Sequence, residues 1–139
     1  MKIVIIGAGF GGIGLGVRLK RSGFHKFTIL ERGNEVGGVW RDNSYPGAAC
    51  DVPSRMYSYS FASNYSWLER FGRQPEILAY LKYCAERFGI RDHIRFNTEV
   101  TEANFDTSSA RWKISTADGK NETAEMLVSA VGLFNRALV

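Results

Sequence analysis

The sequence predicts an α/β fold in which a parallel sheet with a βαβ unit is joined by an antiparallel β-hairpin or meander. Three observations lead to this prediction. An apolar, β-branched run at residues 2–6 is followed by a glycine-rich turn and a helical pattern, and a second apolar run occupies residues 27–31. This order within about 30 residues is typical of a strand–helix–strand unit with a right-handed crossover. Residues 94–131 then alternate between polar and apolar side chains around a turn, which indicates antiparallel strands.

Composition limits the classes of protein to consider. The 139 residues suit one domain, 1–139, and 45% hydrophobic with 23% charged residues is ordinary for a globular protein. A net charge of +4 without a basic cluster leads us to expect no nucleic-acid partner. No apolar stretch is long enough to span a bilayer, so we expect no membrane partner. Cys50 and Cys84 form no CxxC pair, which argues against a disulfide framework and a metal site and favours a cytoplasmic location.

The first strand, 2–6, is continuous and β-branched, which predicts burial on both faces. After the turn at 7–12, a helix should run to about Ser22, with Ile13, Gly16 and Val17 on its packing face and Gly23 as its stop signal. The second buried strand, 27–31, follows.

The segment 33–65 has little periodicity but many aromatic side chains, and we expect an ordered, functional loop. A second helix should begin at 74–76 and end at Gly89, with Cys84 on its apolar stripe as a core thiol. We expect both histidines, His25 and His93, at the surface.

The C-terminal part predicts three elements. Residues 94–100 should form a strand, and 101–117 an antiparallel hairpin ahead of a turn at 118–119. Residues 122–131 should form a return strand that rejoins the parallel sheet beside the first strand.

The glycine turn carries the main functional signal. Gly7, Gly9 and Gly12 satisfy G-x-G-x-x-G between a strand and a helix, where they permit a tight turn, close approach of a pyrophosphate and close helix–strand packing. The helix N-terminus attracts a diphosphate. Glu31 ends the second strand, where a carboxylate can accept both ribose hydroxyls of an adenosine and repel a 2′-phosphate. The sequence thus predicts a Rossmann-like FAD/NAD(P)-binding fold that disfavours NADP at this site and leaves FAD and NAD open.

A second glycine pair, Gly37 and Gly38, is followed by Val39 and Trp40. These glycines permit another close backbone approach, as an extended FAD would need. No cysteine pair follows, which excludes a redox disulfide, and Cys50 alone is interpreted as a packed thiol.

The stretch GGVWRDNSYPGAACDVPSRMYSYSF, residues 37–61, resembles the Baeyer–Villiger and related class B flavin monooxygenases. With the preceding glycine motif and the terminal V-S-A-V-G, the resemblance covers essentially the whole chain. It implies an enzyme that uses FAD, NADPH and O2 to oxygenate a small-molecule substrate. The enzyme would either insert one oxygen atom into a ketone or oxidise a soft heteroatom.

The resemblance also implies roles for individual positions. Asp51 corresponds to a family aspartate that organises the active site, although it could instead cap a helical turn at 52–54. Tyr57 would contact the cofactor, whereas Tyr59 and Phe61 are interpreted as core. The full set assigned to FAD binding is Gly7, Gly9, Phe10, Gly12, Glu31, Arg32, Gly38, Val39, Trp40, Asp51, Tyr57, Val100 and Gly132.

Several motifs that are typical of this family are missing from the 139-residue sequence. It has no second G-x-G-x-x-G, no arginine from an NADPH domain and no F-x-G-x3-H-T-x2-W-P fingerprint. We therefore expect the N-terminal FAD-binding part, incomplete over 1–139, without turnover alone and with an exposed face that favours self-association or a missing second half. Two alternatives remain: a stand-alone NAD/ADP-binding module, or the FAD domain of another flavin oxidoreductase. The 37–61 block argues against both.

Overall fold

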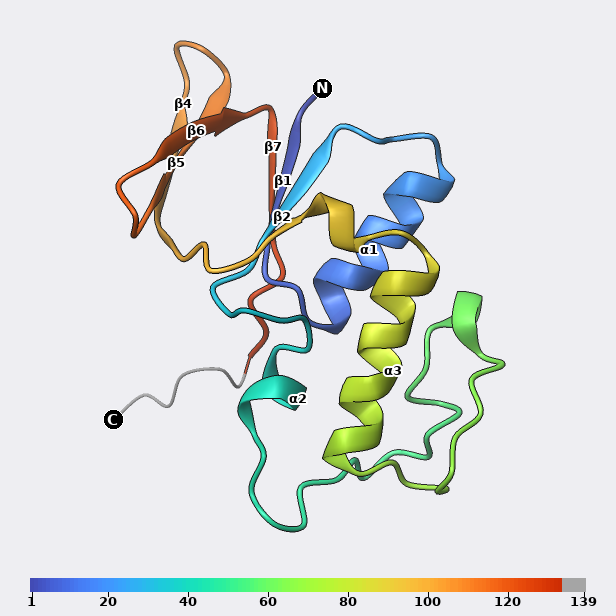
Figure 1. The fold of residues 1–139 in the computed structure, drawn as a ribbon. Coiled ribbons are helices and arrows are strands. Elements are labelled where there is room, and N and C mark those ends of the chain that lie inside the picture. The colour runs from blue at the N-terminus through green and yellow to red at the C-terminus, as the bar shows by residue number, and fades with distance from the viewer. Residues whose placement is uncertain (134–139) are drawn as a thin grey trace.

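The computed structural model describes residues 1–133, so the last six residues of the predicted 1–139 domain lie outside the description (Figure 1). Its centre is a four-stranded parallel sheet in the order β3-β2-β1-β7. The strands are β1 (Ile3–Ile6), β2 (Phe27–Leu30), β3 (Ile94–Arg95) and β7 (Met126–Ser129). The predicted fold class and the return of the last strand beside the first are both confirmed.

Two layers flank this sheet, one on each face (Figure 1). Helices α1 (Phe10–Arg21) and α3 (Gln74–Arg87) lie on one face, where Ile3 and Ile5 of β1 join their core. A second sheet, formed by β4 (Val100–Asp106), β5 (Arg111–Thr116) and β6 (Asn121–Ala124) in that order, lies on the other face and packs against Val4 and Leu30. Strand β1 is therefore buried on both faces, as a continuous apolar run predicts.

The helix boundaries follow their sequence signals. Helix α1 ends in basic residues, and Gly23 follows at φ +82°. Helix α3 has Pro75 in its first turn and is followed by Gly89 at φ +61°. Both glycines take the left-handed conformation that commonly terminates a helix.

The C-terminal part corrects the sequence prediction in two places. The strand expected at 94–100 is reduced to β3, and the hairpin consists of β4 (Val100–Asp106) and β5 (Arg111–Thr116). The single return strand expected at 122–131 is two strands, because β6 (Asn121–Ala124) pairs with β5 before the chain crosses to β1 as β7. The break falls at exposed Glu125, whose carboxylate accepts hydrogen bonds from the Lys2 backbone N–H and from Arg111.

The loop between β2 and α3 is ordered by aromatic packing. It contains helix α2 (Val39–Asp42) and a 3₁₀ turn at Ser60–Ala62, neither of which was predicted. Tyr59 is core, as expected: its hydroxyl donates to the Phe10 carbonyl at 2.7 Å, and its ring lies where a Cβ on Gly14 would approach within 2.9 Å. Phe61 is half-buried and stacks on Tyr59 at a centroid distance of 4.7 Å.

The two histidines differ. His25 is exposed, as expected, but His93 is half-buried and its ring stacks on Phe27 with centroids 4.1 Å apart. Sequence reasoning placed His93 at the surface because no local pattern indicates a contact made 66 residues away.

Cys84 is expected to be unreactive toward thiol reagents while the chain is folded. Its side chain is fully buried, and burial raises the pKa of the thiol to about 11 although a Tyr80 hydrogen bond lowers it. At pH 8 little thiolate therefore forms. In a Cys50→Ser variant, aromatic disulfide reagents should label Cys84 only after denaturant is added. Labelling of the folded variant at the rate of a free thiol would contradict the packing.

Candidate nucleotide-binding cleft

A cleft of ≈ 640 Å³ lies at the carboxyl ends of β1, β2 and β7. Ligands of open α/β sheets bind at this edge. Of the residues assigned to cofactor binding from sequence, those that line the cleft are Gly7, Gly9, Phe10, Glu31, Arg32, Gly38, Val39, Trp40, Tyr57, Val100 and Gly132. The fold therefore brings together side chains spread over most of the chain.

The glycine turn has the shape its spacing predicts. Gly7 has φ +100°, and a Cβ there would lie 2.6 Å from the Ala130 carbonyl oxygen at the end of β7. Gly12 lies beneath the turn rather than in the cleft lining, and its Cβ would lie 1.9 Å from the Gly7 carbonyl oxygen. No acidic residue occupies the first turn of α1, so no negative side chain there opposes an anion at the positive end of the helix dipole.

The second glycine pair lies directly against the first turn. The Gly37 N–H donates to the Ala8 carbonyl at 3.0 Å. Gly38 has φ +53°, and a Cβ there would come within 3.3 Å of the Gly9 Cα. The two segments thus form one continuous backbone surface, open to a ligand that extends beyond the first turn.

Glu31 is buried at the wall of the cleft, with only 4% of its surface exposed. Its Oε2 accepts the Ala8 N–H at 2.8 Å, and its Oε1 accepts the Gly33 N–H at 2.7 Å. Glu31, whose role as the ribose acid stays a prediction, therefore lies in the cleft wall and ties the glycine turn to the segment that follows β2.

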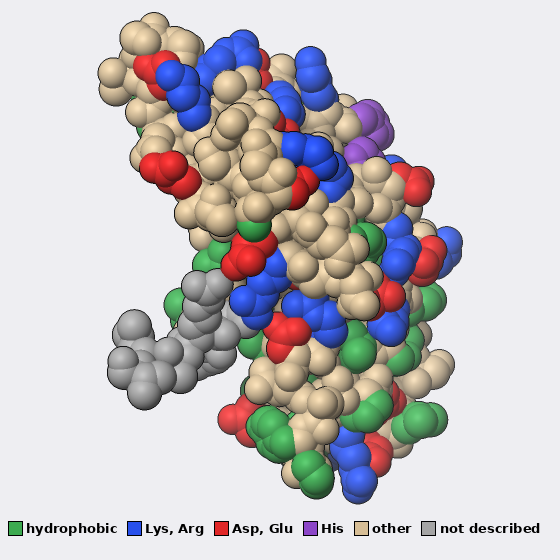
Figure 2. Space-filling view, turned by 60° about the vertical axis from the view of Figure 1, so that its left-hand side comes forward, with side chains coloured by type: hydrophobic (Ala, Val, Ile, Leu, Met, Phe, Trp, Pro, Cys, Tyr) green, Lys and Arg blue, Asp and Glu red, His purple; other side chains and the backbone are tan. Residues whose placement is uncertain are grey.

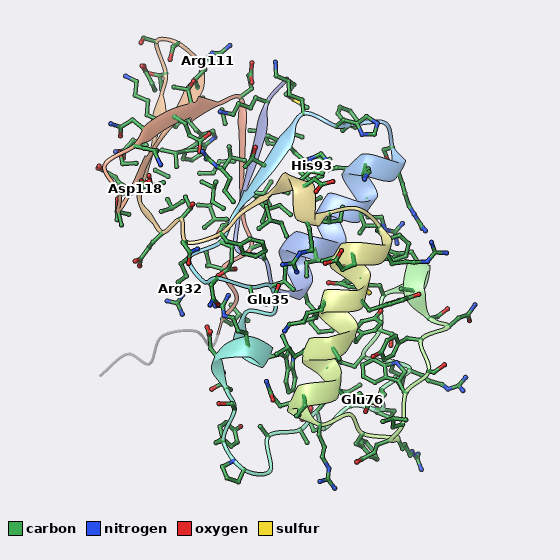
Figure 3. All side chains as sticks on the ribbon, in the orientation of Figure 1. Arg32, Glu35, Glu76, His93, Arg111 and Asp118 are labelled. Carbon is green, nitrogen blue, oxygen red and sulfur yellow. The ribbon has the colours of Figure 1, made fainter. Side chains whose placement is uncertain are left out.

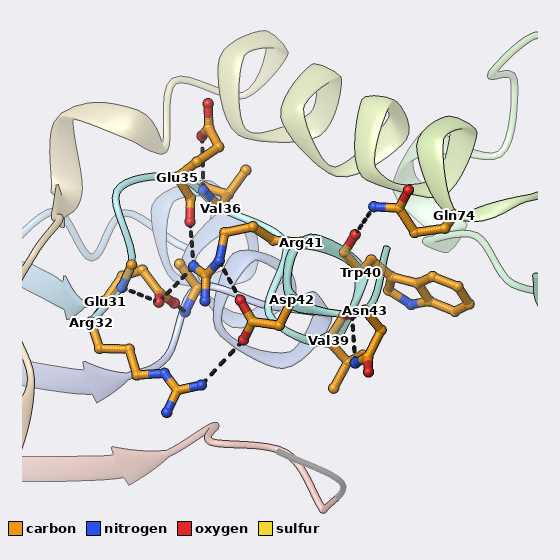
Figure 4. A network of polar contacts seen from close by, with 12 residues as sticks. Glu31, Arg32, Glu35, Val36, Val39, Trp40, Arg41, Asp42, Asn43 and Gln74 are labelled. Carbon is orange, nitrogen blue, oxygen red and sulfur yellow. Dashed lines mark hydrogen bonds and ion pairs between the residues drawn. The ribbon is translucent and has the colours of Figure 1, made fainter. Parts of the chain in front are cut away.

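Sequence reasoning missed Arg41, which reaches back from α2 to this carboxylate (Figure 4). Its Nη1 lies 2.8 Å from Glu31 Oε1, and its Nε donates to Asp42 Oδ1 at 2.8 Å. Arg32 donates to the other Asp42 oxygen at 3.2 Å. Burial raises the pKa of Asp42, but the Arg41 hydrogen bond and charge, with those of Arg32, outweigh burial and lower it overall. The one feature of the sequence that could have pointed to this contact was an arginine directly after G-G-V-W.

Aromatic side chains form the other end of the cleft. The Trp40 indole Nε1 donates to the Tyr57 hydroxyl at 3.1 Å, and Tyr57 meets Phe10 edge-on with centroids 4.7 Å apart. Gln74 at the start of α3 donates to the Trp40 carbonyl and fixes α2 against α3. Burial raises the pKa of Tyr57, although the Trp40 hydrogen bond lowers it. This wall offers apolar faces suited to a planar ring.

Asp51 is exposed and does not line the cleft, so its assignment as catalytic stays a prediction. Thr98 and Glu99, which sequence reasoning did not select, lie in the lining near Val100. Within residues 1–133 no group of three or more His, Cys, Asp or Glu side chains is arranged to hold a metal, and no helix could cross a membrane.

Comparison with known proteins places this geometry in a family. The profile described as "NAD(P)-binding Rossmann-like domain" matches residues 5–83, more than half of the chain. A Baeyer–Villiger monooxygenase from Streptomyces coelicolor is 52% identical over 95% of this chain, which spans 25% of that relative.

Solved structures agree with the sequence match. A steroid monooxygenase bound to NADP superimposes with a TM-score of 0.93 at 42% identity, over 99% of this chain and 27% of that one. The OTEMO complex with FAD and NADP gives a TM-score of 0.93 at 33% identity, over 100% of this chain and 27% of that one. The chain thus spans about a quarter of the length of its relatives. It belongs to the family of NAD(P)-binding Rossmann-like domains, and it is similar to the part of Baeyer–Villiger monooxygenases that it spans.

Proposed function

We propose that this chain binds FAD, as the FAD-binding part of an NADPH- and O2-dependent flavin monooxygenase. The observation that carries the proposal is the continuity of the cleft from the Gly7 turn, past Glu31, to Trp40 and Tyr57. A bare adenine dinucleotide module needs the first two features but not an aromatic wall behind a second glycine turn. The solved relative that holds both FAD and NADP supports the same assignment.

The residues present fit such a cofactor. At the glycine positions a Cβ would collide with neighbouring backbone, so glycine is what lets the two backbone segments pack this closely beside the cleft. Glu31 is held by the Ala8 N–H, in an orientation that allows it to accept a ribose hydroxyl. Bound FAD would supply the redox chemistry of its flavin ring. The chain would hold the diphosphate at α1, orient the adenosine through Glu31 and shield the ring with Trp40 and Tyr57. In the longer protein, Asp51 would help to organise the substrate side.

The activity proposed for the longer protein is Baeyer–Villiger oxidation of a ketone, or oxygenation of a soft heteroatom, with the NADPH site outside residues 1–139. We also propose a cytoplasmic location. Apolar side chains stand exposed on the loop between α2 and α3, including Tyr45, Met56 and Leu68 at 64%, 76% and 89%. Figure 2 shows several hydrophobic side chains at the lower end of the molecule. We propose that this surface meets a second copy or the rest of a longer protein.

A parallel titration of the purified chain with FAD, ADP, NAD and NADP tests the proposal. We expect FAD to bind more tightly than ADP, because the flavin half gains the Trp40 and Tyr57 contacts, and more tightly than either nicotinamide dinucleotide. Calorimetry and flavin fluorescence provide the readouts. Binding of NAD in preference to FAD would favour the stand-alone nucleotide module, which the family profile alone also allows.

A matched pair of glycine variants sharpens the test. Gly38→Ala places a Cβ 3.3 Å from the Gly9 Cα, whereas Gly47→Ala has the same type of positive φ with nothing within 4 Å. We expect Gly38→Ala to weaken FAD binding about 10-fold, the equivalent of roughly 1.4 kcal/mol, and Gly47→Ala to leave it unchanged. Equal effects of both variants would contradict a ligand in the cleft.

A further inference from the structure

Arg41 occupies a slot built for it. Its side chain is 15% exposed, and its guanidinium lies over Gly33, where a Cβ would stand 2.1 Å from Nη1. We call the space over Gly33 that holds the guanidinium the Arg41 slot; it is open because residue 33 has no side chain. This complementarity distinguishes Arg41 from the exposed arginines of the chain, such as Arg111, which Figure 3 shows on the antiparallel sheet far from the cleft.

The guanidinium joins two segments that line the cleft. Its Nη1 donates to Glu31 Oε1 at 2.8 Å and to the Glu35 carbonyl at 2.6 Å, both in the segment after β2. Its Nε donates to Asp42 within α2. Figure 4 shows these bonds converging on one side chain. Arg41 therefore fixes α2, which carries Trp40, relative to Glu31, the acid directly after β2.

These contacts decide which oxygen of Glu31 is left for a ligand. A carboxylate oxygen has two lone pairs. Oε1 accepts the Gly33 N–H and Arg41, and is therefore filled, while among residues 1–133 the one donor to Oε2 is the Ala8 N–H. The carboxylate thus has room for one further donor at Oε2, rather than for two ribose hydroxyls.

We propose that Arg41 is a positioning residue of the nucleotide site: it orients Glu31 so that Oε2 accepts a single ribose hydroxyl. The inference rests on the proposed binding of FAD. Arg41 acts through Glu31 and not by contacting the ligand. Loss of the guanidinium frees the carboxylate to rotate and releases α2 from the segment after β2, so the acceptor is no longer held ready.

A double-mutant cycle on the 139-residue chain tests this role, with FAD and ADP as probes. Arg41→Ala should weaken the binding of both by about 10-fold, the loss that one charge-assisted hydrogen bond accounts for. Glu31→Ala with Arg41→Ala should bind ADP no more weakly than Glu31→Ala alone, because the carboxylate that Arg41 orients is then absent. Losses that multiply in the double variant would overturn the proposal and assign Arg41 to direct ligand contact.

Two further variants separate positioning from folding. Gly33→Ala keeps Arg41 but expels its guanidinium from the slot, so it should reproduce the Arg41→Ala affinities; Arg41→Lys should recover part of them. Arg111→Ala is the matched control, with unchanged affinity expected. All variants are first shown to be folded by thermal unfolding without ligand. Normal affinity in both Arg41→Ala and Gly33→Ala would overturn the inference alone. Absence of FAD and ADP binding by the unmodified chain would overturn the proposed function, and the inference with it.

Discussion

Replacing Gly12 with Ala is expected to lower the free energy of unfolding by about 3 kcal/mol, at the upper end of the usual cost of overpacking. The added Cβ would lie 1.9 Å from the Gly7 carbonyl oxygen and 3.7 Å from Ile5. Backbone cannot rotate away as a flexible side chain can, so α1 must shift off β1. Urea unfolding followed by circular dichroism measures the effect.

The neighbouring glycine provides the control. Gly11 lies in the same helix, is exposed, and its Cβ would meet only the Ala130 methyl at an ordinary 3.5 Å. Gly11→Ala should therefore raise stability by up to about 1 kcal/mol, because alanine favours helix over the unfolded chain. Equal destabilisation by both substitutions would show that α1 does not pack on the turn in this way.

Replacing Glu31 with Ala should produce two separable losses. The chain should lose about 2 kcal/mol of stability, because the buried Ala8 N–H and the Arg41 guanidinium lose their acceptor. Adenosine dinucleotide binding should weaken by a further 1–3 kcal/mol or so, the cost of a ribose hydroxyl left without its partner. Unfolding with and without saturating FAD measures both losses on the same samples.

Glu69→Ala is the matched control for this substitution. Glu69 pairs with Arg73 on an exposed turn, with side chains 49% and 72% exposed, so its removal should change neither stability nor binding measurably. A Glu31→Ala chain that binds FAD with normal affinity would show that this carboxylate does not hold the ribose.

Local patterns were sufficient for the parts of the fold and site that depend on neighbouring residues. The β-branched run at 2–6 specified a strand buried on both faces, and the G-x-G-x-x-G spacing specified the turn, the helix and the close packing of Gly12. The acid that ends β2 and the second glycine pair were likewise readable in order along the chain. Each lies within a short window where sterics and hydrogen bonding constrain the residue type.

The missed features depend on contacts between distant residues. The division of 122–131 into β6 and β7 is set by Glu125, which bonds the Lys2 backbone and Arg111 where the chain changes sheets. The Arg41 slot requires Gly33 and Glu31 to come together with α2, a four-residue helix too short to show periodicity. His93 is half-buried because β3 brings the preceding turn beside Phe27. Contacts of this kind depend on how distant parts of the chain come together in the fold, and a short stretch of sequence does not contain that information.

A crystal structure of the chain with FAD is the sharpest test of whether one continuous cleft holds an extended FAD. We expect the diphosphate at the N-terminus of α1 between Gly7 and Gly9, a ribose hydroxyl on Glu31 Oε2, and the flavin end beside Trp40 and Tyr57. A nucleotide bound elsewhere, or one whose flavin half points away from the Gly37–Gly38 turn, would contradict it.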